Sequence, residues 1–159
     1  MPTTYEPIAT TTLGSAQSSV TFSGIAGTYT DLVLVAQVKY TANPSYAGIR
    51  FNSDSGTNYS NTQIRGNGSS ASSGRNTNAG QITGGSYTTG FTLDIFNIMN
   101  YSNSTTYKTV LRRGNQSDDV AATVGLWRNT NAITSVSYII DTGNLDTGST
   151  FTLYGIKAA

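Results

Sequence analysis

The run DLVLVAQVKY, from Asp31 to Tyr40, is the most apolar stretch of this chain of 159 residues. Its first half is apolar at every position after Asp31, and its second half alternates apolar with polar residues. A continuous apolar run is typical of a strand covered on both faces, and alternation is typical of a strand covered on one face. We therefore expect Asp31 to Tyr40 to form a strand at the centre of a sheet.

Similar short patterns with a period of two residues recur along the chain, separated by turns rich in Gly, Asn and Asp. No segment shows a convincing helical period. Antiparallel strands at this spacing predict an all-β fold, an antiparallel β-sandwich of about eight or nine strands with jelly-roll connectivity. The further strands that we expect are 18–23, 46–52, 59–65, 89–99, 107–113, 120–128, 133–140 and 150–157.

Two segments do not fit the strand pattern. Residues 1–17 are rich in Thr and Ala, contain Pro2 and Pro7, and lack periodicity, so we expect an extended N-terminal arm followed by a sandwich domain at 18–159. The segment 66–86 is almost free of large apolar residues. A long loop in a compact domain is usually functional or mobile, so we expect partner contacts or disorder there.

The composition argues against catalysis. The chain has no histidine, no cysteine and a single glutamate, Glu6, while Ser, Thr, Asn and Gly make up about half of it. General acid and base chemistry draws mainly on His or a tuned carboxylate, and soft metals are bound by His and Cys. With no base available, none of the many Ser and Thr residues is a candidate nucleophile. We expect no enzyme, no cofactor and no metal centre.

The charge balance limits the classes of partner. The formal net charge is +1, and basic residues are scattered except for Arg112 and Arg113, so we expect no nucleic-acid binding. No apolar stretch approaches the length of a membrane span, and the first residues resemble no export signal, so we expect neither membrane insertion nor export. Only 11% of the residues are charged, which favours a working form inside an assembly.

Three stretches carry a resemblance to a known class of protein. They are MPTTYEPIATTTLGSAQSSVTFSGI at Met1 to Ile25, NYSNTQIRGNGSSASSG at Asn58 to Gly74, and GSTFTLYGIKAA at Gly148 to Ala159. These stretches resemble small β-rich virion proteins of tailed phages that infect cyanobacteria and other aquatic bacteria. Within that class, two roles are common, namely decoration of the capsid and service in a tail fibre or spike.

The resemblance implies a cement or decoration protein that stabilises the capsid shell. Such proteins are similar in size to this chain, commonly form trimers, and bridge neighbouring capsomers with terminal arms. The implied partners are the major capsid protein and two further copies of the chain, and the implied location is the capsid surface of the virion. The alternative is a tail fibre or spike subunit that binds a host-surface glycan. A secreted carbohydrate-binding module is a third option, which the missing export signal disfavours.

Several polar groups have both a functional and an ordinary interpretation. Asp118 and Asp119 follow Arg112 and Arg113 across a short hairpin. A carboxylate pair could cleave glycosides, but adjacent residues of a strand point to opposite faces. An ion pair across the hairpin or between subunits is therefore the better account. The turns 52–58 and 141–146 offer oxygen ligands for Ca²⁺, although Asn and Asp are also ordinary turn residues. Gly66-Asn67-Gly68 lacks the spacing of a phosphate-binding loop.

Aromatic side chains either pack in the core or bind sugars and proteins. The aromatic residues open to either role are Tyr46, Tyr59, Tyr87, Tyr101 and Trp127. Partner contacts are expected from the arm, from the 66–86 loop and from the charges around the later hairpin. The expected contact residues are Tyr5, Glu6, Ile8, Arg75, Tyr87, Arg112, Arg113, Asp118 and Asp119.

Overall fold

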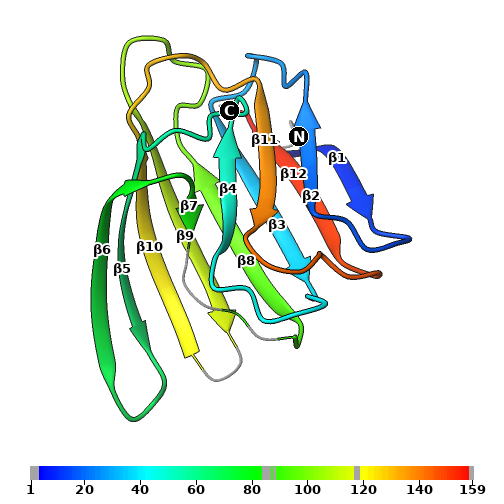
Figure 1. Ribbon diagram of the computed structural model, residues 1–159. Coiled ribbons are helices and arrows are strands. Elements are labelled where there is room, and N and C mark those ends of the chain that lie inside the picture. Colours follow the sequence, from blue (N-terminus) through cyan, green and yellow to red (C-terminus); the bar gives the residue numbers. More distant parts are fainter. Residues whose placement is uncertain (1–3, 84–86, 88, 117–118, 158–159) are drawn as a thin grey trace.

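Two antiparallel sheets face each other in the computed structural model, which describes residues 4–83, 87, 89–116 and 119–157 (Figure 1). Twelve strands are present in these ranges. They are β1 (Tyr5–Thr12), β2 (Ser19–Ser23), β3 (Asp31–Val38), β4 (Ala47–Phe51), β5 (Tyr59–Gly66), β6 (Ala71–Ala79), β7 (Ile82–Thr83), β8 (Thr92–Ile98), β9 (Lys108–Gln116), β10 (Asp119–Trp127), β11 (Ser135–Ile140) and β12 (Thr150–Ile156).

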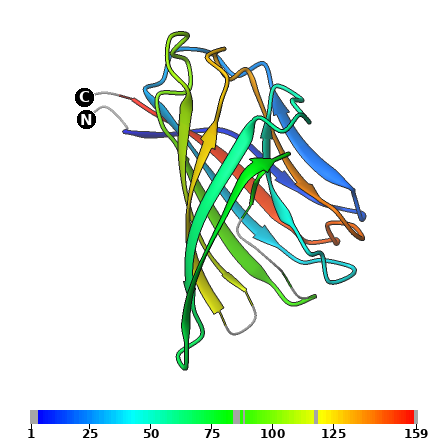
Figure 2. The same ribbon diagram turned by 60° about the vertical axis from the view of Figure 1, so that its left-hand side comes forward.

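The two sheets differ in width. The larger has eight strands in the order β1-β12-β3-β8-β9-β10-β5-β6, and the smaller has four in the order β2-β11-β4-β7. Figure 2 shows the strong twist of the larger sheet, which follows from the right-handed twist of its strands. The expected antiparallel β-sandwich is confirmed. The jelly-roll connectivity is not confirmed by this strand order and stays a prediction.

The core lies between the sheets and is rich in aromatic and β-branched residues. On β3, Leu32, Leu34, Ala36 and Val38 are buried and alternate with less buried positions. This strand occupies the third place among eight, so it is an interior strand, between β12 and β8, although not the central one. In its apolar first half, Val33 on the other face is also buried, whereas Val35 on that face is half-buried.

The N-terminal segment differs from the arm that we expected at residues 1–17. Residues 5–12 form β1, the edge strand of the larger sheet, which pairs with β12 along its whole length. Threonine side chains face each other across this pair; the Oγ1 atoms of Thr10 and Thr152 lie 3.1 Å apart. Leu13, directly after β1, is buried in the core. The segment is part of the sandwich because β-branched Thr residues favour strand pairing even without apolar alternation.

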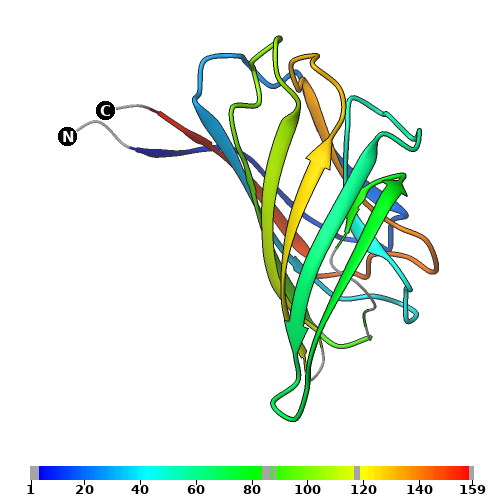
Figure 3. The same cartoon turned by 90° about the vertical axis from the view of Figure 1, so that its left-hand side faces the viewer.

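The expected loop at 66–86 is also corrected. A four-residue turn after β5 leads directly into β6, and β7 follows after two residues. Residues 84–86 lie outside the described residues. The segment looks like a loop in the sequence because β6 is polar on both faces and is exposed at every position except Ala79. In Figure 3 the β5–β6 ribbon projects at the bottom beyond the smaller sheet.

Candidate interaction surface

The larger sheet presents one of its faces to solvent. Its inner face packs against the smaller sheet, and Figure 3 shows that no described element covers the opposite side of β8, β9, β10 and β5. Alternation along each strand decides which side chains point outward. On β10, for example, Ala121, Thr123 and Trp127 are buried, so Val120 and Val124 point away from the core. Within the described residues, this uncovered side is the largest surface without a second layer.

We call the outward positions of β8, β9, β10, β5 and β6 the outer face. Its apolar members come from four strands and gather in one patch. They are Ile64, Leu93, Ile95, Leu111, Val120, Ala122, Val124 and Leu126. Four of them are substantially exposed, with relative accessibilities of 66% for Val120, 65% for Ile64, 53% for Val124 and 42% for Leu93.

The registers of the strands make the patch continuous. Ile64 lies opposite Ala122, Ala122 lies opposite Arg113, and Arg113 lies opposite Ile95. In the neighbouring row, Val124 lies opposite Leu111. Directly opposed side chains in adjacent strands have Cβ atoms about 5 Å apart, so they contact each other along each row. The apolar side chains of the two rows are therefore neighbours across the strands, with Arg113 inside the first row and with Thr62 and Asn97 on either side of Val124 and Leu111 in the second.

The outer face is hollowed at one end. A shallow groove of about 970 Å³ lies across β8, β9, β10, β5 and β6. Its apolar lining includes Ile64, Leu93, Ile95 and Val120. Polar groups in the lining include the Asn115 side chain, whose Oδ1 accepts a hydrogen bond of 2.7 Å from the main-chain N–H of Leu93. The groove is open to solvent along its length, so it suits a protein surface or segment better than an enclosed small molecule.

Charge is scarce on the outer face. Among its described positions only Arg113 and Arg75 are charged, and no carboxylate is present. Asp119, the acidic residue on β10, stands at a position that points to the inner face of the sheet. Its Oδ2 lies 3.7 Å from Arg65 Nε. Apart from arginine, which is common in such places, charged residues are depleted from the cores of protein interfaces, and the outer face has this composition.

A buried ion pair lies directly beneath this surface. Arg112 of β9 and Asp94 of β8 are both completely buried, and Arg112 Nε donates to Asp94 Oδ1 at 2.9 Å. The Tyr138 hydroxyl donates to Asp94 Oδ2 at 2.8 Å, and Arg112 Nη2 donates to the Tyr87 hydroxyl at 3.0 Å. Both ends of the carboxylate therefore have a donor, as a buried charge requires.

The arginine and two of the tyrosines in this cluster have raised pKa values. Desolvation alone would lower the pKa of Arg112, but Tyr87 and Asp94 outweigh it and raise this pKa above its ordinary value. Burial, followed by the charge of Asp94, raises the pKa of Tyr87 and of Tyr138 well above the usual value of a tyrosine. The cluster is buried from solvent, and its two tyrosine hydroxyls stay protonated near neutral pH. It stabilises the register of β8 and β9 and has no access to a substrate.

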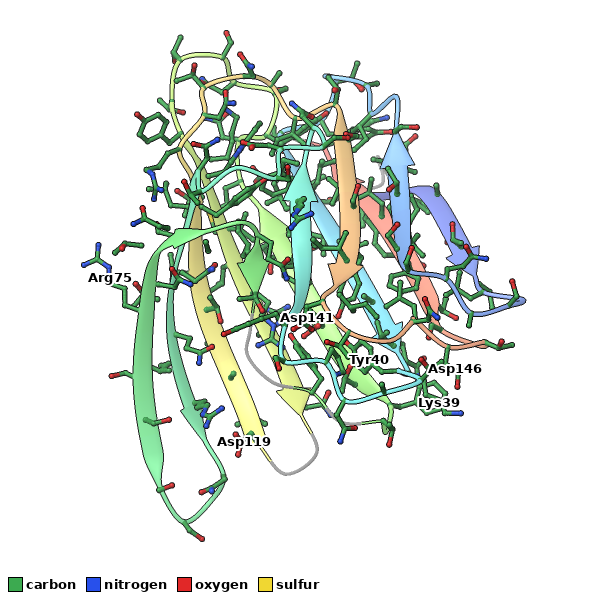
Figure 4. All side chains as sticks on the ribbon, in the orientation of Figure 1. Lys39, Tyr40, Arg75, Asp119, Asp141 and Asp146 are labelled. Atoms are coloured by element: carbon green, nitrogen blue, oxygen red, sulfur yellow. The ribbon has the colours of Figure 1, made fainter. Side chains whose placement is uncertain are left out.

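The expected partner-contact residues fall into two groups. Tyr5 is exposed, Glu6 forms an ion pair with Lys157, and Ile8 packs against the core from β1. Arg113 and Arg75 both point outward, and Figure 4 shows Arg75 at the edge of the β6 ribbon. These five residues are at the surface or edge of the larger sheet, but they are not gathered in one place.

The remaining expected contacts require correction. Tyr87 is buried, and its hydroxyl accepts a hydrogen bond from Arg112. Arg112 is buried because the outward positions on β9 are odd-numbered and its own number is even. Of the two expected cross-hairpin aspartates, only Asp119 lies in the described residues; its Oδ2 is 3.7 Å from Arg65 Nε, and the described ion pair of Arg112 is with Asp94. Asp118 lies outside the described residues.

The aromatic and turn candidates also have ordinary roles. Tyr59, Tyr101 and Trp127 are in the core, whereas Tyr46 is exposed. In the 52–58 turn, both oxygens of Asp54 accept hydrogen bonds, from Gly56 N, from Asn58 Nδ2 and from Trp127 Nε1, so they are not directed at a cation.

The second turn that we considered for Ca²⁺ is similar. Asp146 forms an ion pair with Lys39 at 3.0 Å, as Figure 4 illustrates, and Asp141 Oδ1 accepts from the main-chain N–H of Tyr46. No group of three potential metal ligands from His, Cys, Asp or Glu occurs among the residues that the structure describes. Nor does any helix in these ranges have the length and apolar character needed to cross a membrane.

The period of two residues in the expected strand 120–128 places Val120, Ala122, Val124 and Leu126 on one face, but it does not show that this face is uncovered. A signal was present in the alternate positions of the same strand. Thr123 and Gly125 stand between these apolar residues, and both point into the core. A residue without a side chain is needed at Gly125 because Ile82 of β7 approaches closely; a Cβ on Gly125 would lie 2.6 Å from Ile82 Cγ2.

Comparison with known proteins gave no relative. No protein-family model, no curated protein and no solved structure matches the chain.

Proposed function

We propose that this chain is a structural protein of a phage virion, which decorates the capsid and docks on the major capsid protein through its outer face. The observation that carries the proposal is the uncovered, mainly apolar side of β8, β9, β10 and β5. The resemblance of three sequence stretches to small virion proteins supplies the biological setting. The proposed location is the exterior of the head.

The size of the outer face supports a docking role. Five strands spaced about 4.8 Å apart, over about six residues that each rise about 3.4 Å, give a plan area of roughly 500 Å². The apolar side chains make up part of this area, and contiguous apolar patches of a few hundred Å² on soluble proteins commonly mark interaction sites. Removal of such a patch from water is the dominant favourable term in most protein association. A partner surface that covers the rows around Val124 and Leu111 is therefore expected to bind.

The two arginines indicate the chemistry of the partner surface. Arg113 lies within the apolar rows between Ala122 and Ile95, and a partner that covers it must supply an acceptor to avoid leaving the guanidinium unpaired. A carboxylate satisfies this requirement with two parallel hydrogen bonds. We therefore expect the contact surface on the capsid protein to be apolar with an Asp or Glu facing Arg113.

The mechanism of this role is thermodynamic. A protein that binds the assembled shell and not its separated subunits stabilises the shell by mass action, without any chemical step. Copies that each bury on the order of 1,000 Å² or more bind with the specificity of ordinary protein complexes. The resemblance implies a homotrimer for this role, and sedimentation equilibrium of the purified chain distinguishes a trimer from a dimer.

The test is a count of copies in particles purified from the phage that encodes the chain. Quantitative mass spectrometry is expected to find the protein in a fixed, high ratio to the major capsid protein, and labelled antibodies are expected to mark the head. A few copies located at the tail would overturn the proposal in favour of a fibre or spike subunit. Absence from the particle would exclude both roles.

A further inference from the structure

The β6 strand has an unpaired edge. It is the last strand of the larger sheet, it pairs with β5 on one side, and no described strand pairs with it on the other. Eight of its nine residues are exposed, so its side chains contribute little burial to the fold. Ordering a long strand costs conformational entropy, and an edge strand with exposed side chains recovers little of this cost through burial. A further contact that covers this edge would therefore stabilise the ribbon.

The hydrogen-bonding groups on this edge can be assigned. Asn67 N donates to Ser70 O across the turn, which makes these opposed residues a hydrogen-bonded pair. Hydrogen-bonded and non-hydrogen-bonded pairs alternate in an antiparallel ladder, so Ser72 and Gly74 bond to β5. The main-chain N–H and C=O groups of Ala71, Ser73 and Arg75 then point away from β5, toward open solvent.

The opposite edge of the same sheet is protected. In β1, Pro7 has no N–H to offer, and the register shifts between Pro7 and Ala9. Glu6 adds a charged side chain, paired with Lys157. Proline, irregularity and charge are the devices by which proteins prevent the pairing of sheet edges. In contrast, β6 has no proline, and its regular stretch from Ala71 to Asn76 holds only one charge, at Arg75.

We propose that β6 pairs antiparallel with β6 of a second copy of this chain, about a twofold axis at Gly74. The position of the axis follows from the side chains. Gly74 of one copy lies opposite Gly74 of the other as a non-hydrogen-bonded pair. Residues in such a pair are closer together than those in a hydrogen-bonded pair, and the absence of a side chain permits this approach. Arg75 then lies opposite Ser73 of the partner copy. An axis at Arg75 would place two like charges in direct opposition.

A second copy fits this edge better than a foreign strand. Recognition of a foreign strand by edge pairing takes its specificity from pockets for alternate side chains. The edge offers Ala71, Ser72, Ser73 and Gly74, which are too small to form such pockets. Self-pairing needs no pocket because the matched register supplies the specificity. About four main-chain hydrogen bonds form across the Ser73 and Arg75 pairs, two for each pair.

The twofold axis has a geometric consequence. An axis through facing glycines of two antiparallel strands is perpendicular to the sheet, so both outer faces lie on the same side. The groove is lined by Ala71, Ser72 and Ser73 at its β6 end, so the grooves of the two copies meet across the axis. The dimer has a continuous sheet of twice eight strands with one doubled outer face. The edge pairing stands independently of what binds that face.

Gly74 allows a direct experiment. A Cβ built there meets only Gln63 Cγ and Nε2, both at 3.9 Å, so a side chain fits without strain in the isolated chain. Gly74→Lys and Gly74→Glu each place like charges at the axis, and Gly74→Ala is the uncharged control. Masses are measured by sedimentation equilibrium. The interface is small, so we expect a wild-type dissociation constant on the order of 10 to 100 µM.

The expected result has three parts. The wild type and Gly74→Ala approach twice 16.7 kDa at high concentration. Gly74→Lys and Gly74→Glu dimerise at least about tenfold more weakly, while an equimolar mixture of the two regains dimers, because opposite charges now meet at the axis. A wild-type chain that stays monomeric at about 500 µM, well above the expected dissociation constant, overturns the proposal. A trimer overturns it also, as does equal dimerisation of all four proteins.

Discussion

Arg112 Nε lies 2.9 Å from Asp94 Oδ1, and neither side chain has any solvent exposure. The two residues are on adjacent strands but are offset in register, since Arg112 is opposite Phe96 and Asp94 is opposite Gly114. Gly114 makes the contact possible, because a Cβ there would lie 2.3 Å from Asp94 Oδ1. The ion pair therefore depends on a glycine two residues after the arginine.

Loss of one partner of this pair is expected to destabilise the fold strongly. Arg112→Met leaves the Asp94 carboxylate buried without its cation, and we expect a loss of about 3 to 5 kcal/mol in the free energy of unfolding. The double variant Asp94→Leu/Arg112→Met is expected to lose less than the sum of the two single variants. Urea unfolding of the three variants measures the coupling. Strictly additive losses would contradict the ion pair as the source of the effect.

The sequence indicated the strands well and their partners poorly. Alternation in segments such as 120–128 and 150–157 depends on local residues, and the corresponding strands β10 and β12 lie where we expected them. The pairing of Arg112 with Asp94 depends on the register of β8 against β9, which no local pattern encodes. Sequence reasoning instead paired Arg112 with the nearest acids along the chain.

The same limit applies to the candidate site. A period of two residues identifies which side chains share a face but not which face a second sheet covers. The sequence alone therefore does not decide between the face of Val120 and Val124 and the opposite face of Trp127, which is the buried one. The polar strand β6 was interpreted as a loop for a related reason, since its side chains pack against nothing.

Lysine on the outer face is expected to block docking without unfolding the chain. Val124 is more than half exposed, so Val124→Lys is expected to change the free energy of unfolding by no more than about 0.5 kcal/mol. The charge must be desolvated in a complex, so binding to capsids that lack the protein should be lost. Co-sedimentation with such capsids measures the loss.

A matched control for this variant lies on the other sheet. Ser19 of β2 is exposed and alternates with buried Val20, so Ser19→Lys adds the same charge to the far side of the smaller sheet. We expect this variant to bind capsids like the wild type. Equal binding by Val124→Lys and Ser19→Lys would remove the outer face as the docking surface.

Asp54 is expected to make local stability depend on acid pH. Partial burial alone would raise its pKa, but hydrogen bonds from Trp127, Asn58 and Gly56 outweigh burial and hold the pKa below the ordinary 3.8. A carboxylate with a lowered folded-state pKa stabilises the fold above its unfolded-state pKa, and this contribution is lost as the pH falls through the lower folded-state value.

The single tryptophan reports this titration, because Trp127 Nε1 donates to Asp54 Oδ2 at 2.7 Å. We expect a change in Trp127 fluorescence with a midpoint below 3.8, and its absence in Asp54→Asn. The urea midpoint of the wild type should fall over the same pH range, with a smaller fall in the variant. A fluorescence midpoint above 3.8, or the same transition in Asp54→Asn, would contradict this account.

The attachment of β7 to the smaller sheet is expected to depend on Gly48. A Cβ on this residue of β4 would lie 2.0 Å from the carbonyl oxygen of Ile82, which is main chain and cannot rotate away. Gly48→Ala must therefore displace β7 and the Ile82 side chain from the core, at a cost of about 1 to 3 kcal/mol in the free energy of unfolding. Gly14→Ala is the control, because a Cβ there has no heavy atom within 4 Å. Urea unfolding measures the free energy of unfolding of both variants. Equal values would mean that β7 is not packed as closely on β4 as the structure indicates.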